Sequence, residues 1–444
     1  MHISAIIAEY NPLHTGHQYH IEQTRLLTGA DYVITVLSGD FVQRGLPAIL
    51  DKHTRTRMAL EAGSDLVLEL PVPYALSSAE GFAFGGVSLL HQLNCVDTLS
   101  FGTESGSLEH ILPLVKALSD ETTHYQFAYR EALKQGCSHP SARIRALKAC
   151  YPELDVTPLD GASNNILAIE YCKALHRLKS SIRPVTVKRL GQGYLDTEIS
   201  DGSVTSATAI RNMLNQISDF YVNYANCYYK NTECAESEMP DNLHIPLSDN
   251  LQNTLLNQLQ TYLSPASADI LQNKLYENAL LFPNDFSNLL HYRLLTLSQK
   301  ELCGFWEVTP ELANKISNKL PEFQSFEQFA NLLWSKDLTY ARVCRCLMHI
   351  LLDIKESAWD VLKPTPYARV LGFRRDSAAL LSVIKQSTSI PLVTKVADAE
   401  KHLSQEAYKL FQTDLQAAHI YDSVLQHKSC CKVIHEAQKQ IVII

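Results

Sequence analysis

The sequence predicts an α/β fold: a Rossmann-like domain with a parallel sheet, followed by a mainly α-helical C-terminal domain. In the first half of the chain, short runs of apolar and β-branched residues alternate with segments whose apolar residues recur at helical spacing. In the second half, helical spacing predominates. The 444 residues, 46% of them hydrophobic and 19% charged, suffice for two or three domains.

The first half predicts βαβ units, because strands that are separated by helices pair in parallel. The expected strands are residues 3–8, 32–37, 66–70, 98–101 and 184–188. The expected helices are residues 15–27, 53–62, 79–93 and 165–178. Residues 108–149 predict a helical insertion before the last of these strands.

A polar, irregular segment at 222–242 predicts a linker between a first domain, residues 1–221, and a second domain, residues 243–444. The second domain is expected to be helical, with one short strand near 391–394. Its expected helices are residues 251–263, 268–281, 312–320, 326–334, 340–354, 377–385 and 397–426.

The composition predicts a cytoplasmic protein that binds neither a membrane nor DNA. No segment has the ~20 consecutive apolar residues that a membrane span needs. The net charge of −8 argues against non-specific binding of nucleic acid, although it leaves room for a local basic groove. The eleven cysteines are dispersed and lack CxxC spacing, so we expect reduced thiols and no metal site built from side chains.

The sequence Glu9-Tyr10-Asn11-Pro12-Leu13-His14-Thr15-Gly16-His17 follows the first expected strand directly. A strand, a tight turn and a helix N-terminus bring backbone N–H groups to one point, which favours phosphate. His14 and His17 are three residues apart, so both imidazoles can face the same anion. An isolated HxGH sequence would be explained about equally well by polar residues at a helix start. Its position after the first strand favours the phosphate site.

A second motif, Thr205-Ser206-Ala207-Thr208-Ala209-Ile210-Arg211, lies far downstream. Ser206 is a candidate N-cap, from which Arg211 would project near the start of a short helix. An arginine there can clamp phosphates through its planar guanidinium. A capped surface helix is the alternative explanation.

Together the two motifs resemble those of the nucleotidylyltransferase superfamily, which pairs HxGH after the first strand with an ISSTxxR-like sequence at the domain's end. Thr205 and Ala207 depart from that pattern, which leaves the path of the turn open. Further stretches are similar to the tRNA(Met) cytidine acetate ligase family. These are residues 9–14, 38–48, 101–105, 163–167 and 184–189, and more faintly 340–345 and 368–373.

The resemblance implies a ligase that activates acetate with ATP and transfers the acetyl group to N4 of the wobble cytidine of elongator tRNA(Met). It implies catalytic roles for His14, His17 and Arg211, and Mg²⁺ bound with the nucleotide. The ATP-binding residues that it implies, with Ser206 added as the cap, are Ile7, Ala8, Glu9, Tyr10, Asn11, Pro12, Leu13, His14, Thr15, Gly16, His17, Gln18, Tyr19, His20, Gly102, Asn164, Arg189 and Ser206. Helix capping by Asn164 and a solvent-facing Arg189 are the alternatives there.

Two further groups are expected at the site. Residues after the second strand are assigned to an acetate and cytidine pocket, with a structural salt-bridge loop as the alternative: Asp40, Gln43, Arg44 and Lys52. A basic patch in the second half is assigned to tRNA, with a solvated helix face as the alternative: Arg342, Arg345, Arg369, Arg374 and Arg375.

Two other functions remain open from the sequence. An adenylyltransferase acting on a small phosphorylated cofactor would use the same ATP site, but it gives no role to a long helical domain. A non-catalytic, ATP-sensing RNA-binding protein would use the helical domain, but it gives no role to the histidine pair.

Overall fold

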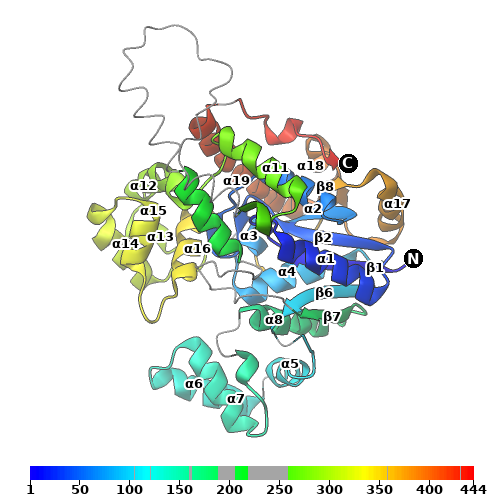
Figure 1. Ribbon diagram of the computed structural model, residues 1–444. Helices are drawn as coiled ribbons and strands as arrows, with labels where there is room; N and C mark the ends of the chain where they lie inside the picture. Colours follow the sequence, from blue (N-terminus) through cyan, green and yellow to red (C-terminus); the bar gives the residue numbers. More distant parts are fainter. Residues whose placement is uncertain are drawn as a thin grey trace, which may run out of the picture.

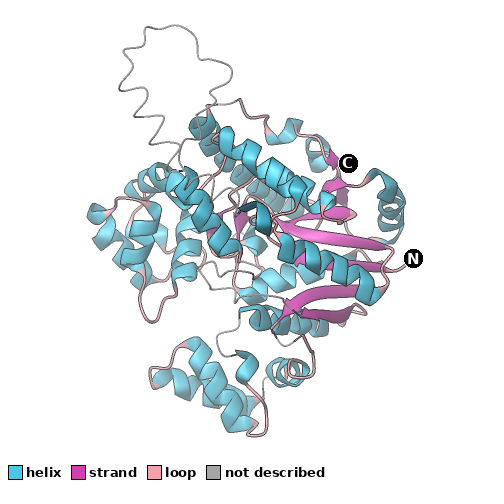
Figure 2. Cartoon of the chain, viewed as in Figure 1, coloured by secondary structure: helices cyan, strands magenta, loops and turns pink. Residues whose placement is uncertain are grey.

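The computed structural model describes residues 1–104, 106–120, 122–159, 163–188, 206–218, 259–357, 359–430 and 432–444. The expected linker at 222–242 lies outside these residues, as does most of the expected helix at 251–263. Figure 1 shows the arrangement of the elements, and Figure 2 distinguishes the helices from the central sheet.

The main part of the sheet consists of five parallel strands in the order β5-β2-β1-β6-β7. These strands are β1 (Ile3–Ala8), β2 (Tyr32–Ser38), β5 (Leu66–Leu70), β6 (Thr98–Thr103) and β7 (Arg183–Lys188). Each of them coincides with an expected strand to within three residues. The parallel sheet predicted from the sequence is therefore confirmed.

Helices cover both faces of this sheet. On one face, α1 (Thr15–Thr28) and α2 (Lys52–Glu61) pack through Ile21 and Met58 into one apolar core. On the other face, α4 (Ala79–Gln92) and α8 (Ser163–Arg177) belong to a separate apolar core. The side of the crossover helices therefore changes between β1 and β6. In doubly wound sheets, ligands bind in the crevice at the carboxyl ends of the strands beside such a switch point.

The predicted helical insertion is confirmed. It consists of α5 (Leu112–Ser119), α6 (Thr123–Lys134) and α7 (His139–Cys150), between β6 and α8. The helix α5 packs on α8, whereas α6 and α7 pack mainly on each other. Figure 1 shows α6 and α7 projecting from the body of the molecule.

The second half is mainly helical, as predicted. Its longer helices are α11 (Pro265–Tyr276), α12 (Ser287–Leu295), α14 (Pro310–Lys319), α15 (Phe326–Leu333), α16 (Tyr340–Leu351), α17 (Ala378–Ser387) and α19 (Gln405–Ser429). The helix expected at 397–426 is in fact divided. Its first part is α18 (Ala399–His402), and Ser404 then caps α19 by accepting a hydrogen bond from the backbone N–H of Ala407.

One expectation about the second half needs correction, because this region also completes the sheet. The strand β8 (Ala368–Phe373) pairs antiparallel with β5, and both β9 (Leu392–Val393) and β10 (Val442–Ile443) pair with β8. Only β9 was expected. The residues after 242 therefore do not form a helical unit separate from the sheet. Among the described helices, none combines the length and hydropathy needed to cross a lipid bilayer.

Candidate active site

The two histidines of the HxGH sequence lie together at the end of β1, beside the switch point. His14 is the N-cap of α1, and its Nδ1 accepts a hydrogen bond of 3.1 Å from the backbone N–H of Gly16. The Nδ1 of His17 accepts one of 3.3 Å from the backbone N–H of His14. The two rings stack with their centroids 3.8 Å apart. The pair is therefore part of a reciprocal helix cap.

These hydrogen bonds fix the role of the other ring nitrogen. Because Nδ1 is the acceptor in both rings, each neutral imidazole carries its proton on Nε2. Both rings then present an N–H donor at the N-terminus of α1, whose dipole also favours negative charge. This combination suits the oxygens of a phosphate.

Arg211 reaches this turn from the far end of the first half. It lies in a helix at 207–218, in which Ser206 accepts a hydrogen bond of 3.1 Å from the backbone N–H of Ala209. Its Nη1 donates to the carbonyl oxygen of Asn11 at 2.7 Å, and its Nη2 donates to the hydroxyl of Thr208 at 3.0 Å. The structure thus brings the arginine of the second motif onto the HxGH turn.

The other expected nucleotide contacts lie at the same carboxyl edge of the sheet. Gly102 lies near the end of β6, paired with Val187 of β7. Asn164, in the first turn of α8, donates to Glu104 Oε1 at 2.9 Å, so it is tied to the end of β6. Arg189 lies outside the described residues.

The first turns of α1 complete the expected ATP segment. His20 contacts the hydroxyl of Ser100 on β6 at 3.0 Å, and Gln18 donates to Glu22 on its own helix. The contact between His20 and Ser100 fixes α1 against the strand across the switch point.

Arg55 of α2 is a site residue that the sequence did not single out. Its fully buried guanidinium donates to the carbonyl oxygens of Glu9 at 2.7 Å, Ser38 at 3.0 Å and Leu50 at 2.9 Å, and it also reaches that of Gly39. Arg55 therefore holds the carboxyl ends of β1 and β2 together. The sequence does not indicate that Arg55 is buried, because Arg55 lies among other polar residues of α2.

The residues assigned to an acetate and cytidine pocket divide into two sets. Gln43 lies between the short strands β3 (Phe41–Val42) and β4 (Leu46–Pro47), and its backbone N–H donates to Glu9 Oε1 at 2.8 Å. Arg44 belongs to the same hairpin and lies partly buried. These two residues border the HxGH turn, so their assignment remains a proposal.

Asp40 and Lys52 belong to a buried ion cluster, which corresponds to the salt-bridge alternative. Lys52 is 1% exposed, and its Nζ lies 2.8 Å from Glu69, 2.9 Å from Glu436 and 3.6 Å from Asp40. Arg369 of β8 pairs with both Glu69, at 2.7 Å, and Glu436, at 2.5 Å. This cluster joins the loop after β2 to the C-terminal segment.

Burial and the neighbouring charges shift the pKa values of ionisable groups in and beside the cluster. Burial alone would lower the pKa of Lys52, but Glu436, Glu69 and Asp40 raise it above its usual range. Burial raises the pKa of Asp40, and Lys52 offsets only part of that rise. Burial raises the pKa of Asp414, beside Glu69, to about 7.

The basic patch expected to bind tRNA is corrected at several positions. Arg369 is 3% exposed and paired, so it does not lie on a surface that RNA could reach. Arg345 is held by Glu307 through two hydrogen bonds of 2.7 and 2.9 Å. Arg374 pairs with Asp376, and its backbone N–H donates to Asp65 at the opposite end of β5 from the HxGH turn. Arg375 is the next residue and lies at the same end of β5. Arg342 lies near the start of α16 and is partly buried.

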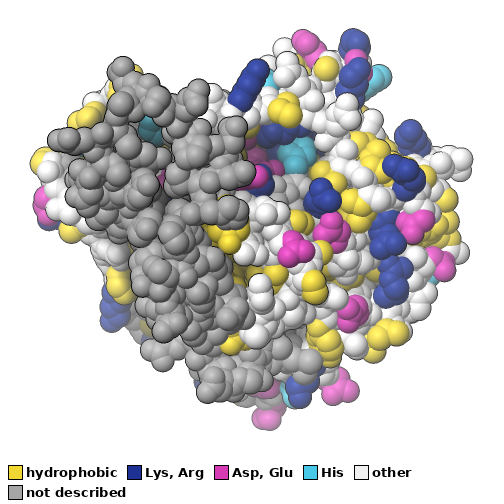
Figure 3. Space-filling model, turned by 45° about the horizontal axis from the view of Figure 1, so that its top comes forward, with side chains coloured by type: hydrophobic (Ala, Val, Ile, Leu, Met, Phe, Trp, Pro, Cys, Tyr) yellow, Lys and Arg dark blue, Asp and Glu magenta, His cyan; other side chains and the backbone are white. Residues whose placement is uncertain are grey.

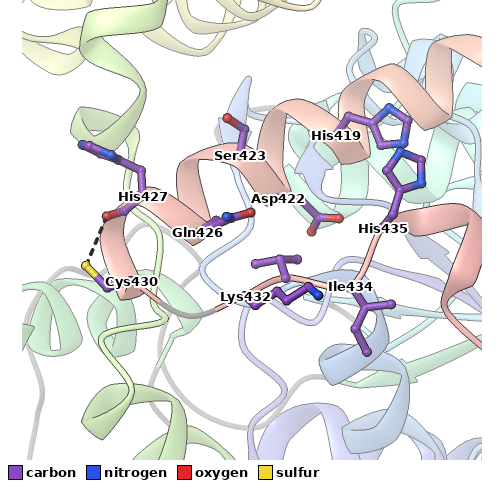
Figure 4. A pocket seen from close by; sticks show the side chains of 10 residues that line it. His419, Asp422, Ser423, Gln426, His427, Cys430, Lys432, Ile434 and His435 are labelled. Atoms are coloured by element: carbon purple, nitrogen blue, oxygen red, sulfur yellow. Dashed lines mark hydrogen bonds between the residues drawn. The ribbon is translucent and has the colours of Figure 1, made fainter.

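An open pocket of about 950 Å³ lies between the end of α19 and the segment that follows it. Figure 4 shows the rings of His419 and His435 close together at one end of it, with their centroids 4.1 Å apart and Asp422 nearby. None of its lining residues belongs to the expected ATP site. It is a feature of the C-terminal segment, separate from the HxGH turn.

Comparison with known proteins agrees with the fold. The chain matches the family described as HIGH Nucleotidyl Transferase over residues 1–436. The class that the parallel sheet, the HxGH turn and Arg211 define is therefore a nucleotidyltransferase of the HIGH type.

Full-length relatives narrow this class. A tRNA(Met) cytidine acetate ligase of Thermoanaerobacter sp. (strain X514) is 37% identical over 429 residues, which cover 97% of each chain. One of Acetivibrio thermocellus is 33% identical over 447 residues, which cover both chains completely. This chain belongs to the tRNA(Met) cytidine acetate ligase family.

Two solved structures are similar over the whole of both chains, each with 25% sequence identity. Thermotoga maritima TmcAL bound with alpha-thio ATP aligns with a TM-score of 0.84. The apo form of the same protein aligns with a TM-score of 0.87.

Proposed function

We propose that this protein is a cytoplasmic, ATP-dependent ligase that activates acetate and acetylates N4 of the wobble cytidine of elongator tRNA(Met). The observation that carries the proposal is the meeting of His14, His17 and Arg211 at one turn beside the switch point of the sheet. Family membership over the whole chain supports the substrates, acetate and tRNA.

The first step is the attack of an acetate oxygen on the α-phosphorus of ATP. A phosphorus–oxygen bond to acetate forms, the bond to the β-phosphate oxygen breaks, and pyrophosphate leaves. Negative charge grows on the leaving group, so the imidazole donors of His14 and His17 and the guanidinium of Arg211 stabilise the transition state more than the ground state. Positioning and charge neutralisation are the protein's main contributions to such a transfer.

The second step is acyl transfer. The N4 amine of cytidine attacks the acetyl carbon, the bond to AMP breaks, and the amine releases one proton. AMP is a good leaving group, which reduces the need for a strong protein base. Gln43 and Arg44 remain candidates for the surroundings of acetate and cytidine, whereas Asp40 and Lys52 are buried in the ion cluster.

We further propose that Mg²⁺ binds together with the nucleotide, where it supplies positive charge to the phosphates. The turn itself presents imidazole and guanidinium groups, which suit phosphate oxygens better than they suit a hard cation. An ion held by phosphate oxygens and water fits this arrangement.

Pyrophosphate release in the presence of ATP and acetate, with and without tRNA, tests the proposal. Release that depends on acetate supports the ligase. Release that depends instead on a phosphorylated cofactor would favour an adenylyltransferase, and no release under any condition would favour an ATP-sensing RNA-binding protein.

A further inference from the structure

The inserted hairpin of α6 and α7 is basic, although the chain as a whole has a net charge of −8. Residues 122–150 contain one acidic residue, Glu131, against five basic ones: Arg130, Lys134, Arg143, Arg145 and Lys148. On the face of the molecule in Figure 3, by contrast, the Lys and Arg side chains are mixed with Asp and Glu. Within residues 122–150, the Lys and Arg residues therefore outnumber the acidic residues five to one.

Three of these cations are directed to solvent. Arg130, Arg145 and Lys148 are exposed, and among the described residues none of the three forms an ion pair. Arg145 and Lys148 are three residues apart on α7, so they share one face of that helix. The remaining two cations are paired, Arg143 with Glu170 of α8 at 3.3 Å and Lys134 with Glu131.

An exposed aromatic side chain lies next to one of these cations, Arg130. Phe127 is 64% exposed and lies three residues before Arg130, on the same face of α6. The interior of the hairpin is filled by other residues, among them Tyr125, Ala142 and Leu147, so packing of the hairpin does not require Phe127. Cations that bind phosphates beside an aromatic ring that stacks on a base are the usual means of binding single-stranded RNA.

Both ends of the insertion are anchored at the candidate ATP site. It leaves from the end of β6, where the backbone N–H of Glu104 donates to Asn165 Oδ1 at 3.3 Å. It returns at α8, where Asn164 donates to the side chain of Glu104 at 2.9 Å. The pair of Arg143 and Glu170 further fixes α7 to α8. RNA bound to the hairpin would thus be held on a support that is rooted beside the nucleotide.

We propose that the α6–α7 surface, formed by Phe127, Arg130, Arg145 and Lys148, binds the anticodon arm of the RNA substrate. The inference rests on the proposed function and assigns its RNA-binding surface. The anticodon arm fits this surface because it offers both a phosphate backbone and unpaired loop bases. Arg374 and Arg375, in contrast, lie at the opposite edge of the sheet from the HxGH turn.

The test compares two double charge reversals in the full-length protein. Arg145→Glu/Lys148→Glu changes the proposed surface, and Arg375→Glu/Lys385→Glu changes two exposed cations at the opposite edge of the sheet. The dissociation constant of elongator tRNA(Met) transcript is measured at several salt concentrations. Acetate-dependent pyrophosphate release without tRNA is measured on the same samples, because it reports the fold and the ATP site independently of RNA.

We expect the first variant to bind tRNA about tenfold or more weakly and with a shallower salt dependence, because phosphate contacts are lost. The control variant should bind like the unmodified protein, and both should release pyrophosphate normally. Phe127→Ala should weaken binding by about 5- to 150-fold with little change in the salt dependence, because stacking is lost.

Unchanged tRNA binding by both Arg145→Glu/Lys148→Glu and Phe127→Ala, with normal pyrophosphate release, would overturn the inference while the proposed function stood. Weaker binding by the control variant alone would also overturn it. If the unmodified protein bound no tRNA at all, the proposed function itself would fail, and this assignment with it.

Discussion

The guanidinium of Arg211 donates a hydrogen bond to the carbonyl oxygen of Asn11, 200 residues earlier in the chain. The side chain of Asn11 also accepts a hydrogen bond of 2.9 Å from the backbone N–H of Ile49, in the loop before α2. The turn that carries His14 and His17 is therefore held from two directions before any nucleotide binds. Such preorganisation lets the donors act on a transition state without being reordered first.

The histidine pair can be tested by His17→Ala. Loss of the Nε2 donor should slow acetate-dependent pyrophosphate release by about 10²- to 10³-fold, as for other groups that stabilise developing charge. Loss of the cap should also lower the free energy of unfolding by about 1 kcal/mol. The measurements are pyrophosphate release and urea unfolding, with tRNA binding expected to remain.

A second variant separates the two effects of His17. His17→Gln keeps an acceptor at the third helical position, where glutamine is a usual capping-box residue. It should restore the stability and leave the reaction slow. Normal turnover in either variant would contradict a catalytic role for His17.

Arg211 can be tested by Arg211→Lys, which keeps the charge and removes the planar fork. A lysine cannot span Asn11 and Thr208 as the guanidinium does. We expect kcat/KM for ATP to fall by about 10- to 100-fold, as for loss of a bidentate cation. In the matched control, Thr208→Val, Arg211 keeps its contact with Asn11, so the loss should be much smaller. Equal losses would show that Thr208 positions the arginine.

The parallel sheet was predictable because each of its strands is a short, continuous apolar run that is bounded by helical spacing. The HxGH turn was predictable for the same reason, since its chemistry lies within nine consecutive residues. The contribution of β8 was not predictable, because its partner β5 lies some 300 residues earlier in the chain and because Arg369 interrupts its apolar pattern.

The ionic residues show a second limit of the sequence. Arg369 and Lys52 resemble surface cations as long as their partners are unknown, and those partners, Glu69 and Glu436, are distant in the chain. Only the fold shows that all four side chains are buried together. The basic hairpin of α6 and α7 was missed for a different reason, because its charged residues form no recognisable sequence motif.

The buried ion cluster predicts a large effect of Glu436→Gln. The change removes one of the two carboxylates that pair with both Lys52 and Arg369, so that Glu69 alone pairs with both buried cations. Removing one partner from a buried ion pair typically costs about 3–5 kcal/mol. The matched control is Glu406→Gln, which breaks an exposed pair with Lys363 and should cost less than about 1 kcal/mol. Urea unfolding measures both, and equal costs would contradict a structural role for the cluster.

Gly45 predicts a coupling between the hairpin after β2 and α16. It has a φ of +74°, and an added Cβ would lie 2.1 Å from the backbone nitrogen of Arg345. Gly45→Ala should therefore destabilise the protein by more than the about 1 kcal/mol expected from the positive φ alone. The control is Gly29→Ala, where φ is +64° and no atom lies within 4 Å of the added Cβ. Similar melting temperatures for the two variants would contradict the close approach.

Asp414 predicts a pH dependence of stability. It accepts hydrogen bonds from the backbone N–H of Val72 at 2.8 Å and from the hydroxyl of Tyr367. The charge of Glu69 raises its pKa, and the charge of Lys52 lowers it. Burial, followed by the charge of Glu69, raises its pKa to about 7. A carboxyl with a raised pKa binds its proton more tightly in the folded protein. Its contribution to stability is thus present below about pH 4 and lost as the pH rises to about 7.

Asp414→Asn should remove this loss, since asparagine keeps an acceptor for Val72 and cannot ionise. Between about pH 4 and 7, its free energy of unfolding should fall less steeply than that of the unmodified protein, by at most about 1.4 kcal/mol per pH unit. Asp376→Asn is the control, because hydrogen bonding to Arg374 lowers the pKa of Asp376 and moves its effect below that window. Parallel pH profiles for Asp414→Asn and the unmodified protein, measured by urea unfolding, would show that Asp414 is already ionised at acidic pH.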